Sequence, residues 1–98
     1  MHKLKRLAAG EHVFSVTTGA INIFMKRSRD AAKYISKQKG FKAVFPSGEG
    51  HTLWFFDTLG NAKIARNRMR AEGIQCGRNI CEFVIREDGG ADFFDKAD

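Results

Sequence analysis

The chain has 98 residues, of which 43% are hydrophobic and 29% charged, with nine Phe and a single Pro. This length fits one domain that can fold without metal or disulfides, and the composition excludes a disordered chain. No apolar run approaches the ~20 residues of a membrane span, so we expect a cytoplasmic protein with no membrane partner.

The net charge of +6 is distributed unevenly along the chain. Residues 1–81 carry 15 Lys and Arg against five acidic residues, whereas residues 82–98 carry two against six. A basic body with an acidic end is a pattern of polyanion-binding proteins, although it also occurs in proteins that only need to stay soluble. The charge is therefore compatible with a polyanion such as nucleic acid as a partner, but it does not separate these two interpretations.

Two segments before the first helix have the alternation of a β-strand. Residues 20–25 predict the first strand of the domain, because apolar residues recur there at every second position. Residues 12–17 alternate as well. Either residues 12–26 form one long strand with a bulge near Gly19, or the earlier piece pairs elsewhere.

Two helices are predicted from apolar residues at helical spacing and from their end signals. The first covers residues 28–39, with Ser28 as a candidate N-cap and Gly40 as a natural stop. The second covers roughly residues 59–72, with alanines on the buried side and Gly73 after its end.

Three further strands are predicted at residues 41–45, 51–56 and 79–86. The order βαββαβ with right-handed crossovers predicts a ferredoxin-like α+β sandwich. We expect a four-stranded antiparallel sheet in the order 4-1-3-2, with both helices on one face. Residues 1–88 would form this single domain, and residues 89–98 a flexible acidic tail that folding does not need.

No catalytic, metal or cofactor motif is present in the sequence. Cys76 and Cys81 lack the CxxC spacing of a zinc or redox site, and the three His are scattered. No activated nucleophile or carboxylate pair can be named. We therefore predict a non-enzymatic protein that needs neither metal nor cofactor.

The sheet face away from the helices is the first candidate binding surface. If Trp54 and Phe56 point toward the helices, the opposite face combines aromatic and cationic side chains, as platforms for single-stranded nucleic acid do. The candidates on this face are Phe24, Lys26, Lys42, His51 and Phe55.

Residues 50–69 resemble the third strand and second helix of the RNA-recognition motif. Gly50, Trp54, Phe56, Ala62 and Ala65 match the family's glycine, strand residues and paired alanines. The resemblance implies a βαββαβ sandwich that binds single-stranded RNA through aromatic residues on its sheet.

The chain departs from the family at the positions that contact RNA. Glu49 replaces the family's basic residue before the third strand, and His51 and Leu53 replace its stacking aromatics there. On the first predicted strand, Asn22 replaces the third stacking residue. The resemblance therefore concerns the fold more than the activity.

Lys63, Arg66 and Arg70 form a second candidate surface. They recur at spacings of three and four and so share one flank of the second helix. This stripe is either a solvated helix face or a phosphate-binding surface. Acidic residues that could pair with it along the helix are nearly absent, which favours phosphate binding slightly.

The sequence thus predicts a small binding module associated with nucleic acid, with single-stranded RNA or DNA as its partner. The alternative is a protein-interaction module. Such a module would form a homodimer through the exposed sheet face or inhibit a larger nucleoprotein enzyme.

Overall fold

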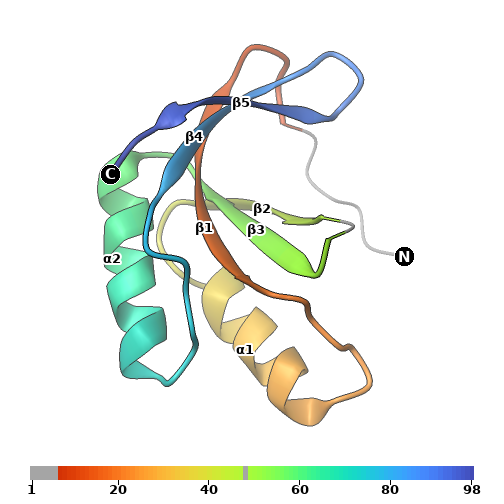
Figure 1. Cartoon of the computed structure of the whole chain (residues 1–98), viewed down its shortest axis with the longest axis vertical. Coiled ribbons are helices and arrows are strands. Elements are labelled where there is room, and N and C mark those ends of the chain that lie inside the picture. Colours follow the sequence, from red (N-terminus) through yellow and green to blue (C-terminus); the bar gives the residue numbers. More distant parts are fainter. Residues whose placement is uncertain (1–6, 48) are drawn as a thin grey trace.

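The computed structural model describes residues 7–47 and 49–98. It has two helices and an antiparallel sheet, so the predicted α+β class is confirmed (Figure 1). The sheet has five strands rather than four, in the order β2-β3-β1-β4-β5. Its elements are β1 (His12–Gly19), α1 (Lys26–Ser36), β2 (Phe41–Pro46), β3 (His51–Phe56), α2 (Leu59–Ala71), β4 (Cys81–Ile85) and β5 (Ala91–Lys96).

The first strand lies earlier in the chain than predicted. Residues 12–19 form β1, which pairs with β3 on one side and with β4 on the other. Residues 20–25, the predicted first strand, form the loop that leads into α1. Asn22 closes a turn in this loop, because its Oδ1 accepts a hydrogen bond from the amide of Phe24 at 3.0 Å. The alternation of residues 20–25 therefore does not reflect a sheet.

Helix α1 also begins and ends earlier than predicted. Its N-cap is Met25, whose side chain makes no capping hydrogen bond. Ser28, the predicted N-cap, therefore lies inside the helix, which begins at Lys26. The chain then turns through Gly40, whose φ is +83°. A Cβ at this position would overlap the side chains of Asp57 and Asn61. Only glycine therefore lets the connection between α1 and β2 pass so close to the beginning of α2.

Residues 91–96, which the sequence assigns to a flexible tail, form the edge strand β5. This strand pairs with β4 in antiparallel register. The ring of Phe93 packs edge-to-face on Phe83 at 5.9 Å, and the amide of Ala97 donates to the carbonyl of Ile80 at 2.8 Å. The acidic end of the chain is therefore part of the sheet. The sequence around Phe93 does not reveal this, because the partner of Phe93 is Phe83 on another strand.

Two cores lie on opposite faces of the sheet. Helix α2 and Ile35 of α1 cover the larger one, which includes Trp54, Phe56 and Met69. The indole Nε1 of Trp54 donates to Thr18 Oγ1 at 2.9 Å, so this buried polar group is satisfied.

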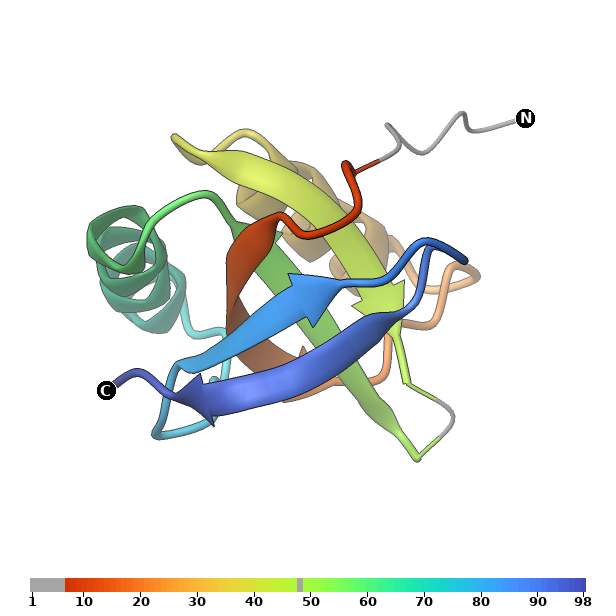
Figure 2. The same cartoon turned by 90° about the horizontal axis from the view of Figure 1, so that it is seen from above.

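The second core lies on the face without helices. It is built from Val13, Phe55 and Ile85, against which Leu7 and Phe83 pack. Figure 2 shows why this face is not open: the sheet coils so strongly that β4 and β5 run across the direction of β2 and β3.

Alternation along the strands predicts that Phe41, Ala43, Trp54, Phe56, Phe83 and Ile85 all point toward the helices; this is right for Phe41, Trp54 and Phe56 and wrong for the other three. Phe83 and Ile85 lie in the second core, not under the helices. Ala43 joins them there, because a bulge between Phe41 and Ala43 reverses the alternation along β2. The face to which the residues of β2 point could not be predicted beyond the bulge, because nothing in the sequence indicates that a bulge is present.

Candidate nucleic-acid interface

The eight candidate residues lie in three separate places. Lys63, Arg66 and Arg70 lie on α2, Phe24 and Lys26 where α1 begins, and Lys42, His51 and Phe55 on β2 and β3. The structure therefore does not bring them together into one surface.

The first group, which we name the α2 cationic flank, consists of Lys63, Arg66 and Arg70. It forms because Ala62, Ala65 and Met69 turn toward the sheet and leave these three residues on one side of the helix. Arg66 Nη1 donates to the carbonyl of Arg78 at 3.1 Å, and Arg70 Nη2 donates to that of Gly77 at 3.1 Å. These bonds tie the flank to the loop before β4.

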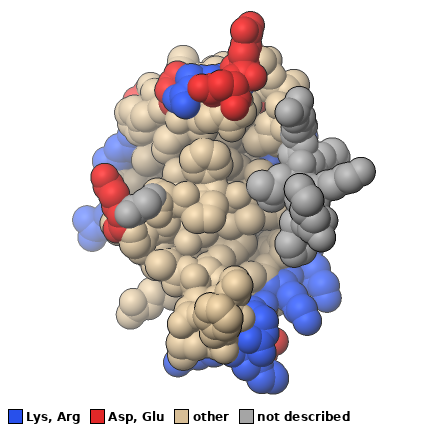
Figure 3. All heavy atoms as spheres, turned by 90° about the vertical axis from the view of Figure 1, so that its right-hand side faces the viewer, with Lys and Arg blue, Asp and Glu red and all other residues tan. Residues whose placement is uncertain are grey.

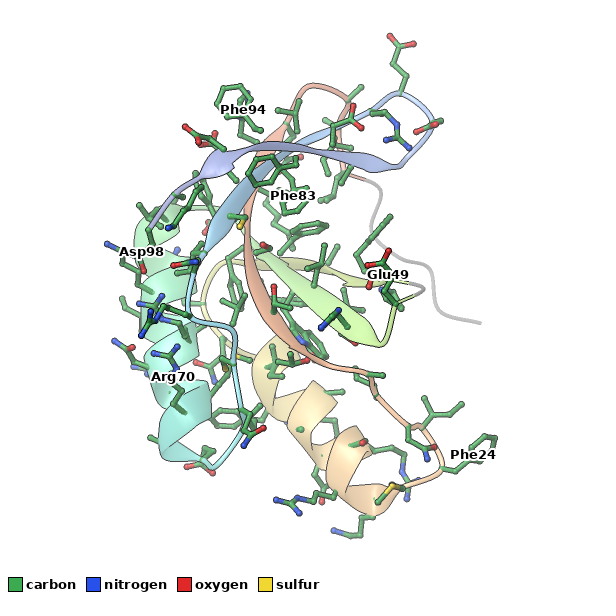
Figure 4. The ribbon with its side chains drawn as sticks, viewed as in Figure 1. Phe24, Glu49, Arg70, Phe83, Phe94 and Asp98 are labelled. Carbon is green, nitrogen blue, oxygen red and sulfur yellow. The ribbon has the colours of Figure 1, made fainter. Side chains whose placement is uncertain are left out.

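The carboxylate of Asp98 lies on the α2 cationic flank (Figure 4). Its oxygens are 2.6 Å from Arg66 Nη1 and 3.7 Å from Lys63 Nζ. The hydrogen bond from Arg66, followed by the charge of Lys63, lowers the pKa of Asp98 below its ordinary value. Two cations thus converge on a single anion position, which an acidic side chain of the same chain occupies.

Arg66 has donor capacity beyond this contact. Its guanidinium is largely buried, and its Nε has no hydrogen-bond partner among residues 7–47 and 49–98. A buried donor without a partner is costly, so an acceptor placed on the flank with a second oxygen would gain a bond that Asp98 does not make.

The sheet group does not form a stacking platform. Phe55 is 1% exposed, because it packs in the second core between Phe45 and Phe83, with ring centroids 5.9 and 5.4 Å away. Lys42 is paired with Glu11 at 3.1 Å. His51 is exposed at the beginning of β3. The expectation that Phe55 offers an accessible ring on this face is therefore wrong.

The positions taken from the RNA-recognition motif also differ from the expected arrangement. Asn22, the expected stacking position of the first strand, lies in the loop after β1. Leu53 is on β3 but packs against the second core. The aromatic residues of this face form the row Phe45–Phe55–Phe83–Phe93, in which Phe55 is buried and the exposed rings of Phe45 and Phe93 lie at the two ends. The row therefore does not present adjacent exposed rings at the positions that the resemblance implies.

The third group lies at the end of the molecule where α1 begins. The side chain of Phe24 points away from the body of the protein and is 87% exposed (Figure 4). Lys26 pairs with Asp30 one turn later in α1, at 2.8 Å. This hydrogen bond raises the pKa of Lys26 and lowers that of Asp30.

Positive and negative charge are separated across the molecule. Residues 26–39 carry six Lys and Arg and one acidic residue, and residues 59–78 carry five Lys and Arg and one acidic residue. On the face in Figure 3, one end carries acidic side chains around a basic one, since Asp88 and Asp92 pair with Arg86, and further Lys and Arg gather toward the other end, where α1 begins. Both helices and their connections are thus basic, whereas the β4–β5 end is acidic.

A groove of about 990 Å³ lies between α1 and the turn that follows α2. Trp54, Tyr34 and Ile35 form part of its apolar lining, and its charged residues are of both signs.

Residues 7–47 and 49–98 contain no cluster of three or more His, Cys, Asp or Glu that could hold a metal ion. Among the helices in the same ranges, none has the length and hydrophobicity to cross a bilayer.

Comparison with known proteins gives no relative: no family model, curated protein or solved structure matches the chain.

Asp98 is the residue of this region that sequence analysis missed. It is 32 positions from Arg66 in the chain, and only the pairing of β5 with β4 brings it to α2. The signal that could have found it is the adjacent pair Phe93 and Phe94, two strand-forming aromatic residues within an otherwise polar segment.

Proposed function

We propose that the protein is a small, non-enzymatic module of the cytoplasm that binds the backbone of single-stranded nucleic acid through the α2 cationic flank. The observation that carries this proposal is the convergence of Lys63 and Arg66 on the carboxylate of Asp98. A backbone phosphate has the same single negative charge as this carboxylate and likewise offers two charged oxygens, which can bind one guanidinium in a bidentate manner. It would therefore take the position of Asp98 and satisfy the Nε of Arg66.

The charge separation supports the same proposal. Residues 59–78, which include α2, carry five Lys and Arg against one acidic residue, so the side of the domain that bears the flank presents positive charge to a polyanion. Contacts of this kind read phosphates rather than bases, so binding should be independent of sequence and strongly dependent on salt.

The fold is part of the proposal, because the arrangement of the strands suggests a known class of α+β domain. We assign the domain to the ferredoxin-like class with one added edge strand. The support is the order β2-β3-β1-β4 within the sheet together with the chain order βαββα. The resemblance of residues 50–69 to the RNA-recognition motif is consistent with this assignment, although the proposed surface is on α2 and not on the sheet.

The test is the affinity for a fluorescent single-stranded oligonucleotide at about 50 and about 200 mM salt. The informative variant is Lys63→Gln/Arg70→Gln, which leaves Arg66 and its bond to the carbonyl of Arg78 in place. Because Arg70 likewise donates to the carbonyl of Gly77, a thermal melt of this variant has to show that the domain stays folded. The control is Lys37→Gln/Lys39→Gln, which removes the same charge after α1. The proposal requires that only the first variant weaken binding.

A protein-interaction module is the second candidate function, favoured by the outer edge of β5. Phe93 and Phe94 are both exposed on this strand, which has no neighbour on its outer side among the described strands. A partner strand or a second copy could extend the sheet there. A dimer that persists without oligonucleotide, with no shift when oligonucleotide is added, would support this candidate over the first.

A further inference from the structure

The loop before α1 presents three consecutive large apolar residues to solvent, which we name the tip: Ile23, Phe24 and Met25. Their side chains are 67%, 87% and 53% exposed. Single exposed apolar residues are common on protein surfaces, but adjacent large ones gathered at a protruding point usually mark a contact with a partner. The tip plays no part in the α2 cationic flank.

Hydrogen bonds hold the backbone of the tip in place. The amide of Phe24 donates to Asn22 Oδ1 at 3.0 Å, and the amide of Met25 donates to the carbonyl of Asn22 at 3.0 Å. Arg29 Nη1 then donates to the carbonyl of Ile23 at 2.8 Å. The polar groups of the loop are thus used internally, and the three apolar side chains are turned outward.

Cations surround the tip. Lys26, Arg27 and Arg29 follow it in the first turn of α1, and Lys33 lies one turn further. Asp30 is the acidic residue among them and is paired with Lys26. The acidic β4–β5 end lies at the opposite end of the molecule (Figure 3). The charge distribution would therefore orient the protein with its tip toward an anionic surface.

The geometry of the tip favours a fluid apolar phase over a rigid partner. Ile23 and Met25 are aliphatic and gain little from the face of a base, so stacking would use Phe24 alone. Because the three residues are consecutive on a protruding loop, their side chains project in different directions. A bilayer surface can surround all three and is negatively charged where anionic lipids are present.

We propose that the tip inserts into the headgroup–acyl boundary of an anionic lipid bilayer, with the cations of the first turns of α1 lying against the lipid headgroups. This is peripheral binding, in which electrostatic attraction and shallow apolar insertion act together because neither alone is sufficient. The inference goes beyond the proposed function and does not depend on it. The tip uses a different set of side chains, and Phe24 and Asp98 lie on opposite sides of the molecule (Figure 4).

The test is flotation of the full chain with vesicles. One set is phosphatidylcholine alone, and in the other about a quarter of the lipid is phosphatidylglycerol. We expect binding to the anionic vesicles only. Phe24→Ser should lower the partition coefficient roughly tenfold, as expected when a large apolar side chain no longer leaves water. The matched control is Phe94→Ser, which removes an exposed Phe at the acidic end and should bind like the wild type.

A second variant reports insertion directly. Phe24→Trp places an indole on the tip. Trp54 contributes an emission that should not change with vesicles, because it is buried and hydrogen-bonded to Thr18, and the wild type measures this background. The emission of the indole on the tip should shift to shorter wavelength with anionic vesicles and stay unchanged with neutral ones. Phe24→Ser and Phe24→Trp should keep the thermal midpoint of the wild type, since the side chain of Phe24 is exposed.

Three results would overturn the inference. The first is equal binding of the wild type to neutral and anionic vesicles, or no binding to either. The second is equal binding of Phe24→Ser and Phe94→Ser to anionic vesicles. The third is a loss of oligonucleotide affinity in Phe24→Ser without an effect on flotation, which would assign the tip to nucleic acid. Failure of the proposed function itself would appear separately, in the Lys63→Gln/Arg70→Gln variant.

Discussion

Asp98 places its carboxylate 2.6 Å from Nη1 of Arg66, so the acidic end of the chain occupies the cationic flank of α2. If this flank binds phosphate, Asp98 competes with the ligand. We predict that Asp98→Asn raises the affinity for a single-stranded oligonucleotide several-fold at about 50 mM salt. The measurement is fluorescence anisotropy.

The control for this variant is Asp95→Asn. It removes the same charge from β5, but at a position that contacts its own strand rather than α2. An equal gain of affinity in both variants would mean that only the net charge matters and would contradict a specific competition by Asp98.

The pKa of Asp98 predicts how stability depends on pH. Because Arg66 and Lys63 hold the pKa of Asp98 lower in the folded state than in the unfolded state, the ion pair stabilises the fold above the ordinary Asp range. This contribution is lost as the pH falls through the lowered pKa. The thermal midpoint of Asp98→Asn should therefore lie below that of the wild type at pH ~7. The difference should begin to shrink only below about pH 4 and vanish once the pH is below the lowered pKa of Asp98. A difference that stays constant with pH would exclude the linkage.

The burial of Phe55 gives a prediction about the second core. Phe55→Ala should lower the free energy of unfolding by about 3–5 kcal/mol, because it leaves a cavity between Phe45 and Phe83. Urea denaturation provides the measurement, and Phe94→Ala, at an exposed position, should change it by less than about 1 kcal/mol. A stable Phe55→Ala protein would mean that the helix-free face is open to solvent after all.

Strand β5 gives a further prediction, opposite to that of the sequence. Removing residues 91–98 should destabilise the domain by several kcal/mol, because each ladder hydrogen bond contributes about 0.5–1.5 kcal/mol and Phe83 loses its contact with Phe93. Equilibrium urea unfolding of the shortened chain measures the loss. An unchanged midpoint would show that the segment behaves as the flexible tail that its composition suggests.

Sequence reasoning worked where local signals and tertiary packing agree. The strand 51–56 and the helix that follows were placed within one residue, and Trp54 and Phe56 face the helices as predicted. The small residues Ala62 and Ala65 let α2 lie against the sheet, and their spacing reveals this directly.

It failed where a local pattern had more than one physical explanation. Ile21, Ile23 and Met25 alternate like a strand, yet only Ile21 packs against the core and the other two belong to the tip. Residues 12–17 carry the same alternation and are the true first strand, because β3 and β4 bury it from both sides. No local signal separates these two outcomes.

The candidate site was predicted in part. The sharing of one helix flank by Lys63, Arg66 and Arg70 follows from their spacing alone. The contact with Asp98 depends on long-range strand pairing, and the burial of Phe55 depends on the coiling of the sheet. Neither relationship can be obtained from the spacing of residues along the chain.

The salt dependence of oligonucleotide binding tests the central claim most directly. For the wild type, the logarithm of the affinity should fall linearly with the logarithm of the salt concentration, by about 0.7 for each phosphate contact. Lys63→Gln/Arg70→Gln should reduce this slope by about 1.4, corresponding to two lost contacts, while Lys37→Gln/Lys39→Gln leaves it unchanged. The absence of binding at about 50 mM salt, or an equal slope in all three proteins, would contradict the assignment of the α2 cationic flank as the nucleic-acid interface.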